Sequence, residues 1–207
     1  IFDLDGTLAE TLPVSLEALQ YTFKRFFGRL FTHRELLDHF GPSEEGIVSR
    51  LLPDRAEECL IYYYRQYARL HHLCPYPFPH VHDTLVTLRD GGTRLALVTA
   101  KGPVTTAISL RRLGLADLFD HVECGFPDKT RKTVGIQRVL RKWNLLPDCA
   151  AYVGDRVSDV EAARATGLLP IAAAWSERVE HDALEQSKPA ALFCSVRDFE
   201  KWIFNGA

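Results

Sequence analysis

The sequence predicts an α/β protein with a doubly wound, mostly parallel sheet, into which an all-helical segment is inserted. After residue 78, short apolar runs of strand character alternate with amphipathic helical stretches, the pattern of a parallel sheet covered by helices. From residue 11 to residue 77 the apolar positions instead recur every three or four residues, which indicates helices. We therefore expect an α/β domain made of residues 1–10 and 78–207, and a helical domain made of residues 11–77.

The inserted segment is expected to contain helices at residues 12–30, 32–40, 44–52 and 53–73. The second of these stops at Gly41-Pro42-Ser43, a sequence that breaks a helix. The fourth contains a cluster of tyrosines, which we interpret as core and interface packing. The alternating prolines between residues 74 and 79 cannot continue a helix, so this stretch is expected to link the two domains.

In the α/β part, predicted strands and predicted helices follow one another along the chain. The strands are expected at residues 94–99, 121–123, 150–153, 168–173 and 191–193, and the helices at residues 81–90, 103–112, 132–143, 158–166, 177–186 and 195–203. Ser158 and Glu161 have the spacing of a capping box at the start of their helix, and Gly167 follows its end.

The chain opens with two carboxylates on a predicted strand. Ile1 and Phe2 lead directly into Asp3, and Asp5 follows two positions later, just before Gly6. Asp3 and Asp5 are expected to point the same way, because side chains at positions i and i+2 of a strand share a face. Two carboxylates this close repel each other unless a cation or a proton lies between them. The pattern suits a metal site or a nucleophile–acid pair, but it also occurs in surface turns.

Polar side chains follow two more of the predicted strands. Thr99 comes directly after the apolar run 95–98, and Asp155 follows the strand at 150–153, with Asp159 one helical turn further on. Parallel sheets bind ligands at the carboxyl ends of their strands. Because three separate strands bring carboxylates and a hydroxyl to that edge, the sequence predicts a functional site there.

The oxygen-rich character of this edge favours a hard cation. Mg²⁺ binds through one or two carboxylates and keeps waters for its substrate, and Asp3 and Asp155 supply two from different strands. No matching cluster of histidine and cysteine occurs, which disfavours zinc. One aspartate can then attack a phosphoryl group while the other moves the proton. Thr99 can bind the phosphoryl oxygens, and a lysine is expected to complete the charge stabilisation.

These residues resemble the motifs of the haloacid dehalogenase (HAD) superfamily. The matching motifs are Asp3-Leu4-Asp5-Gly6-Thr7, Thr99 after an apolar strand, and Gly154-Asp155-x-x-x-Asp159. The resemblance covers the whole chain and implies a Rossmann-like core. The helical insertion resembles the C1-type cap of the phosphoglycolate phosphatase-like group, and Gly41-Pro42-Ser43 resembles its cap loop. The resemblance implies a Mg²⁺-dependent phosphatase that hydrolyses a small phosphorylated metabolite through an aspartyl-phosphate.

The resemblance also implies a role for each matching residue. Asp3 would be the nucleophile and a Mg²⁺ ligand, and Asp5 the general acid and base, with its backbone carbonyl on the metal. Thr99 would bind the phosphoryl group. Asp155 would ligate Mg²⁺, and Asp159 would ligate it through water or orient the lysine.

The lysine motif departs from the pattern of the group. Residues 128–133 lack the usual Lys-Pro pair and offer two candidates, Lys129 and Lys132. We favour Lys132, because it opens a predicted helix and its distance in sequence from Asp155 is closer to that of the family. Lys101 lies near the site and is interpreted as a weaker substrate contact.

Other activities of the same superfamily are weighed against these residues. A metal-free dehalogenase has no second acid, so Asp5 argues against it. A related sugar phosphomutase carries a histidine where this chain has Ser15. A phosphomutase or a pyrophosphatase of the same fold stays an alternative, as does a non-catalytic interaction protein that kept the scaffold. The substrate is left open among phosphoglycolate, a sugar phosphate, a nucleotide and pyrophosphate.

The bulk composition excludes some partners and places the chain in a compartment. The net charge of −2 gives no nucleic-acid footprint, and the apolar runs are too short to span a membrane. The five cysteines are odd in number and form no CxxC pair, which favours reduced thiols in a cytoplasmic protein. We expect a monomer or a homodimer.

Overall fold

The structure, a computed structural model, describes residues 1–128 and 132–205. Within them, the strands are β1 (Ala96–Val98), β2 (His121–Glu123), β3 (Ala151–Gly154), β4 (Leu169–Ala173) and β5 (Ala191–Phe193). β1 pairs with β2, β3 with β4, and β4 with β5, always in parallel. Phe2 forms parallel bridges to both Leu97 and Val153, so the first residues of the chain lie between β1 and β3 and join the strands into one sheet.

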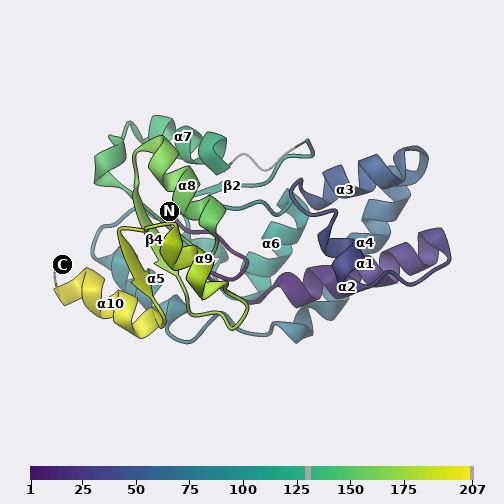
Figure 1. The fold of residues 1–207 in the computed structure, drawn as a ribbon, viewed down its shortest axis with the longest axis horizontal. Helices are drawn as coiled ribbons and strands as arrows, with labels where there is room; N and C mark the ends of the chain where they lie inside the picture. Colours follow the sequence, from purple (N-terminus) through teal and green to yellow (C-terminus); the bar gives the residue numbers. More distant parts are fainter. Residues whose placement is uncertain (129–131, 206–207) are drawn as a thin grey trace.

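Helices cover both faces of this sheet (Figure 1). On one face, α7 (Lys132–Trp143) and α8 (Val157–Thr166) pack against apolar side chains of β1 and β3. On the same face, α9 (His181–Gln186) packs against β4, β5 and α8. On the other face lie α5 (Val81–Asp90), α6 (Pro103–Arg112) and α10 (Val196–Asn205). The predicted doubly wound α/β fold with a parallel sheet is therefore confirmed.

The inserted segment forms a separate lobe of helices at one end of the molecule (Figure 1). Its helices are α1 (Leu12–Phe27), α2 (His33–Leu37), α3 (Glu44–Leu51) and α4 (Ala56–Leu70). Short 3-10 turns occur at Pro53–Arg55, His71–Leu73, Ala116–Leu118 and Pro147–Cys149. Tyr63 and Tyr67 of α4 are fully buried, and the Tyr67 hydroxyl lies 2.7 Å from Ser109 Oγ of α6, so this tyrosine cluster does pack at the interface. None of the described helices combines the length and apolar character that crossing a bilayer requires.

Two local expectations are corrected by the structure. The first helix stops at Phe27 rather than at residue 30, because Gly28 adopts the left-handed conformation (φ +72°) that ends a helix. The capping box expected between Ser158 and Glu161 is also wrong. The helix begins at Val157, and the carboxylate of Asp159 accepts a hydrogen bond of 3.1 Å from the Arg156 backbone N–H.

Candidate active site

Asp3 is held at the centre of the sheet by backbone hydrogen bonds. Its N–H donates to the Val153 carbonyl at 2.9 Å, and the preceding Phe2 N–H donates to the Ala96 carbonyl at 2.9 Å. The side chain is buried, and its Oδ2 accepts a 2.7 Å hydrogen bond from Lys132 Nζ. Its Oδ1 is also buried and has no hydrogen-bond partner among the described residues. One oxygen of this carboxylate is therefore paired with a cation and the other is open.

Gly6 allows the loop after Asp3 to pass close to Asp155. The glycine has φ +78°, and a Cβ at this position would clash with Asp155 Oδ2. Any other residue would both strain the backbone and displace that carboxylate. Thr7 fixes the same carboxylate by donating to Asp155 Oδ1 at 3.3 Å. The Asp-x-Asp-Gly-Thr motif thus places one strand end against another.

Three carboxylates meet at this point. Oxygen atoms of Asp3, Asp155 and Asp159 all lie within 4.8 Å of one another. Burial, and then the charge of Asp3, raises the pKa of Asp155 to about 8. Burial also raises the pKa of Asp159, although Lys132, which donates a hydrogen bond to it, opposes the shift. The three carboxylates carry more negative charge than Lys132, the described lysine in contact with them, can balance, as expected of a pocket that binds a cation.

The carboxylate of Asp5 is not one of these three and contacts other side chains. Its Oδ1 accepts a hydrogen bond from Thr11 Oγ1 and lies 3.4 Å from Lys101 Nζ. Burial raises the pKa of Asp5, and the charge of Lys101 only partly offsets the rise. A carboxyl group with a raised pKa holds a proton more readily, as a general acid must. The two aspartates of the opening motif therefore occupy different environments.

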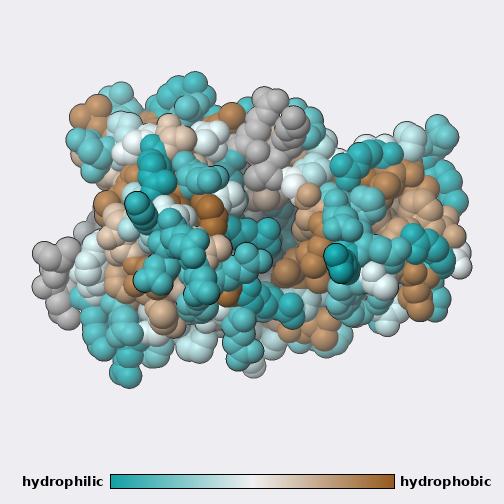
Figure 2. Space-filling model, in the orientation of Figure 1, coloured by the Kyte–Doolittle hydropathy of each residue, from teal (hydrophilic) through white to brown (hydrophobic). Residues whose placement is uncertain are grey.

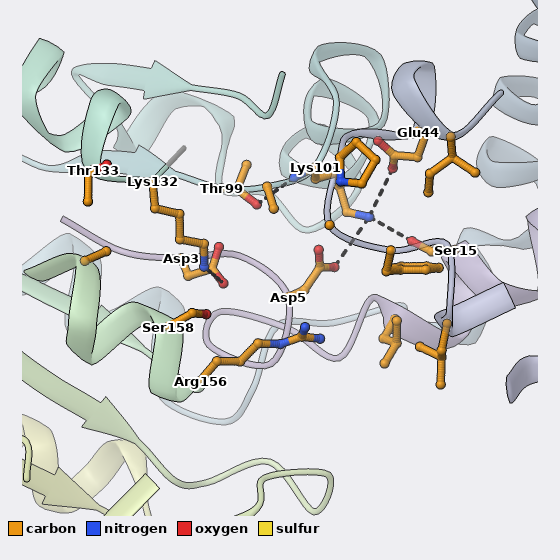
Figure 3. Close-up of a pocket in the computed structure, with 18 of the residues that line it drawn as sticks. Asp3, Asp5, Ser15, Glu44, Thr99, Lys101, Lys132, Thr133, Arg156 and Ser158 are labelled. Atoms are coloured by element: carbon orange, nitrogen blue, oxygen red, sulfur yellow. Dashed lines mark hydrogen bonds and ion pairs between the residues drawn. The ribbon is translucent and has the colours of Figure 1, made fainter. Parts of the chain in front are cut away.

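Lys101 is buried between the two lobes (Figure 3). Its Nζ donates to Ser15 Oγ at 2.8 Å and lies 3.6 Å from Glu44 Oε1, both residues of the helical lobe. Burial alone would lower the pKa of Lys101, but the charge of Asp5 raises it, so the amine stays protonated. The lysine thus connects the opening motif to the inserted helices.

Glu44 holds the helical lobe against the α/β core. It opens α3, and its carboxylate accepts hydrogen bonds from the backbone N–H of Gly102 at 2.6 Å and from Thr105 Oγ1 at 2.8 Å. Both donors lie at the start of α6, where the helix dipole favours a negative charge. Nearby, the Ser43 N–H donates to the Phe126 carbonyl at 3.0 Å. These contacts close the lobe over the carboxyl edge of the sheet.

A cavity of about 630 Å³ lies between the lobes, a volume that suits a small ligand. Figure 2 shows the hollow between them. Its polar lining comes mainly from the core and its apolar lining mainly from the helical lobe; the residues are Asp3, Asp5, Leu12, Ser15, Leu37, Phe40, Gly41, Pro42, Glu44, Ile47, Thr99, Ala100, Lys101, Lys132, Thr133, Arg156, Ser158, Glu161, Ala162 and Ala165. Thr99 is held by a 3.0 Å hydrogen bond from its N–H to the Glu123 carbonyl.

The structure brings together the residues that the sequence singled out. Lys132 bonds both Asp3 and Asp159, and Asp155 has an oxygen within 4.8 Å of these two carboxylates. Asp5 and Thr99 line the same cavity as Asp3 and Lys132. The alternative lysine, Lys129, lies outside the described residues.

Six polar residues that line the cavity were not predicted as site residues: Ser15, Glu44, Thr133, Arg156, Ser158 and Glu161. Arg156 and Ser158 carried a signal, because both lie inside the Gly154–Asp159 motif. Ser15 and Glu44 had none, since nothing in a helical period distinguishes a buried polar position from an exposed one.

The fold and this acidic, lysine-paired site define a hydrolase class, and the chain belongs to the haloacid dehalogenase-like hydrolases. The model of that family matches residues 1–173. Among curated proteins, a pyrophosphatase PpaX from Listeria welshimeri is 30% identical over 214 residues, covering 97% of this chain and 96% of the relative. The chain is therefore an enzyme of a known hydrolase family.

Solved structures share the fold. A predicted phosphoglycolate phosphatase from Haemophilus somnus superposes with a TM-score of 0.75 at 23% identity, covering 97% of this chain and 95% of that one. CbbY from Rhodobacter sphaeroides, crystallised in complex with phosphate, superposes with a TM-score of 0.78 at 20% identity, covering 94% and 92%. Both cover nearly all of this chain, so the helical lobe and the core belong to one shared fold.

Proposed function

We propose that this enzyme is a Mg²⁺-dependent phosphatase that hydrolyses a small phosphomonoester through an aspartyl-phosphate on Asp3. The observation that carries the proposal is the split environment of the Asp3 carboxylate. One oxygen is bonded to Lys132, while the other is buried and unpartnered among the described residues. The carboxylate as a whole lies close to those of Asp155 and Asp159. A buried polar atom without a partner is costly unless a ligand satisfies it.

The residues fit a magnesium ion. The donors are carboxylate oxygens, which a hard cation prefers, and the unpartnered Asp3 oxygen needs a positive partner. Asp3 and Asp155 would hold the ion, with Asp159 nearby and the backbone carbonyl of Asp5 as a further donor. When bound, the ion would neutralise charge on the transferred phosphoryl group and on the carboxylates around it.

The remaining chemistry follows from the side chains. The Asp3 carboxylate attacks phosphorus, and the bond from phosphorus to the leaving oxygen breaks. Asp5, whose pKa is raised by burial, gives its proton to that oxygen. Asp5 then takes a proton from water, which attacks the aspartyl-phosphate to release phosphate and restore Asp3. Lys132 and Thr99 stabilise the charge on the phosphoryl oxygens.

We propose that residues 11–77 act as a cap over this site, with residues 1–10 and 78–207 as the catalytic core. The cap supplies the apolar wall of the cavity, and Glu44 and Ser15 bind core residues across the interface. Closure of such a cap excludes water from the reacting groups and fits the leaving group. A small metabolite is favoured because the cavity is small.

Turnover of phosphomonoesters should require Mg²⁺. We expect the purified enzyme to hydrolyse at least one member of a panel that contains phosphoglycolate, sugar phosphates, nucleotides and inorganic pyrophosphate. Chelation with EDTA should abolish release of phosphate, and added Mg²⁺ should restore it. The panel includes pyrophosphate because the Listeria welshimeri relative is named a pyrophosphatase. An enzyme that turns over none of these compounds, or that ignores EDTA, would contradict the proposal.

The Asp155→Asn protein tests whether this carboxylate binds the metal. It should lose turnover together with any rise in melting temperature that Mg²⁺ gives the wild type, because it loses a metal ligand. Without metal it should be at least as stable as the wild type, since the change removes a buried carboxylate that Asp3 repels. Melting curves with and without Mg²⁺ separate loss of the metal site from loss of the fold.

A further inference from the structure

The described positive charges that line the cavity differ in how they are paired. Lys132 is bonded to Asp3 and Asp159, and Lys101 lies against Asp5 and Glu44. The guanidinium of Arg156 has no ion pair or side-chain hydrogen bond to any described residue.

Arg156 follows Asp155 directly, at the end of β3, so its backbone is fixed by the sheet edge. Figure 3 shows its side chain passing beneath Asp5, with the guanidinium directed toward the cap side of the cavity and away from Lys132. The residue is more than a third exposed, so its free donors are open to a ligand. An arginine presents a planar fork of donors that matches carboxylate and phosphoryl oxygens.

The side chain of Arg156 carries a full positive charge, because an arginine guanidinium stays protonated in proteins. A charged fork that no side chain of residues 1–128 or 132–205 pairs with is available to an anion that enters the cavity.

The position relative to Asp5 decides which part of a substrate the guanidinium meets. In the proposed reaction Asp5 protonates the leaving oxygen, so the leaving group lies on the Asp5 side of the phosphorus. Lys132 lies on the opposite side of Asp3 in Figure 3. On the cap side, the cavity is lined by Glu44, which is paired with Lys101, and by apolar side chains such as Leu37 and Phe40, which give a leaving group no charged partner. Arg156 is the described cation that reaches this side unpaired.

We propose that Arg156 is a specificity residue that binds a second anionic group on the leaving group. The preferred substrates are then phosphoryl compounds whose leaving group carries a carboxylate or another phosphoryl group, rather than neutral alcohols. This inference rests on the proposed function and narrows its substrate class.

The test compares substrates that differ only in that charge. 2-Phosphoglycolate and 2-hydroxyethyl phosphate form a matched pair, and inorganic pyrophosphate adds a phosphoryl leaving group. Arg156→Gln should lower kcat/KM for the two anionic substrates by about 30-fold or more, because it removes one partner of a charged pair. It should change kcat/KM for 2-hydroxyethyl phosphate by no more than about twofold. Arg156→Lys, which keeps the charge without the fork, should fall between these results.

Two controls make the outcome specific. Arg141→Gln removes the same charge from an exposed position on α7 and should not change kcat/KM for either member of the matched pair. Binding to the Mg²⁺-loaded Asp3→Asn protein, measured by calorimetry, gives a readout that needs no turnover. In the Asp3→Asn protein, Arg156→Gln should weaken the binding of 2-phosphoglycolate and leave the affinity for 2-hydroxyethyl phosphate unchanged.

If Arg156→Gln lowered kcat/KM equally for both members of the matched pair, the inference would be overturned, because the guanidinium would then act on the transferred phosphoryl group. Unchanged binding of both compounds would overturn it as well. Either result leaves the proposed phosphatase function standing, since the wild-type enzyme would still release phosphate. Failure of the wild type on the whole panel would instead refute the proposed function, and the calorimetric arm would still decide the role of Arg156.

Discussion

Asp3→Asn should lower kcat by at least about 10⁴-fold while the protein remains folded. The amide oxygen is a poor nucleophile, and the change also removes one negative charge from the proposed metal site. The fold should persist because the backbone of Asp3 keeps its 2.9 Å hydrogen bond to Val153 and the amide can still accept from Lys132. Phosphate release and circular dichroism measure the two effects separately.

Asp54→Asn is the matched control for this change, because Asp54 is an exposed aspartate of the helical lobe, outside the cavity. It should retain wild-type turnover. Substantial activity in the Asp3→Asn protein would refute the assignment of the nucleophile.

Lys132→Ala should lower kcat by about 10²- to 10³-fold, the usual cost of removing one donor that stabilises the transition state. The change should also destabilise the metal-free protein by about 3–5 kcal/mol, because it leaves two buried carboxylates without their cation. Lys132 Nζ bonds both Asp3 and Asp159, and its side chain is only 7% exposed. Steady-state kinetics and thermal melting, each with and without Mg²⁺, measure the two losses.

Lys129→Ala supplies the comparison, because Lys129 is the other lysine of the same segment. Its effect on kcat should be smaller than that of Lys132→Ala. If Lys129→Ala is the more damaging change, the lysine of the site has been assigned wrongly.

The elements of the α/β core were predictable because their signals are local. An apolar run such as 95–98, followed by a polar residue and a Gly-Pro pair, specifies a strand, a turn and a helix within a few residues. The ends of elements were less predictable. The apolar period of the first helix continues to residue 30, but Gly28 is left-handed and stops the helix at Phe27.

Three motif residues of the site were predictable because each directly follows a strand. Asp3, Thr99 and Asp155 all come after apolar runs, and parallel strands bring their ends to one edge. The capping box expected between Ser158 and Glu161 does not form, because a residue of the site takes its place. Asp159 is already bonded to the Arg156 backbone and to Lys132, so it, and not Glu161, caps the helix.

The contacts between the lobes were not predictable. Glu44 bonds Gly102 from 58 positions away, and Lys101 bonds Ser15 from 86 positions away. Such pairs depend on how the inserted helices sit on the core, which no local pattern records. The raised pKa of Asp5 was not predictable either, since its largest cause is burial, which depends on how distant parts of the chain pack together.

The covalent intermediate on Asp3 is tested most directly by trapping it. The enzyme is quenched during turnover of its best substrate, treated with borohydride, which reduces an acyl phosphate to an alcohol, and digested for peptide mass spectrometry. We predict conversion of Asp3 to homoserine, dependent on substrate and on Mg²⁺, with Asp5 unmodified. Turnover without modification of Asp3, or with modification of Asp5 in its place, would contradict the proposed mechanism.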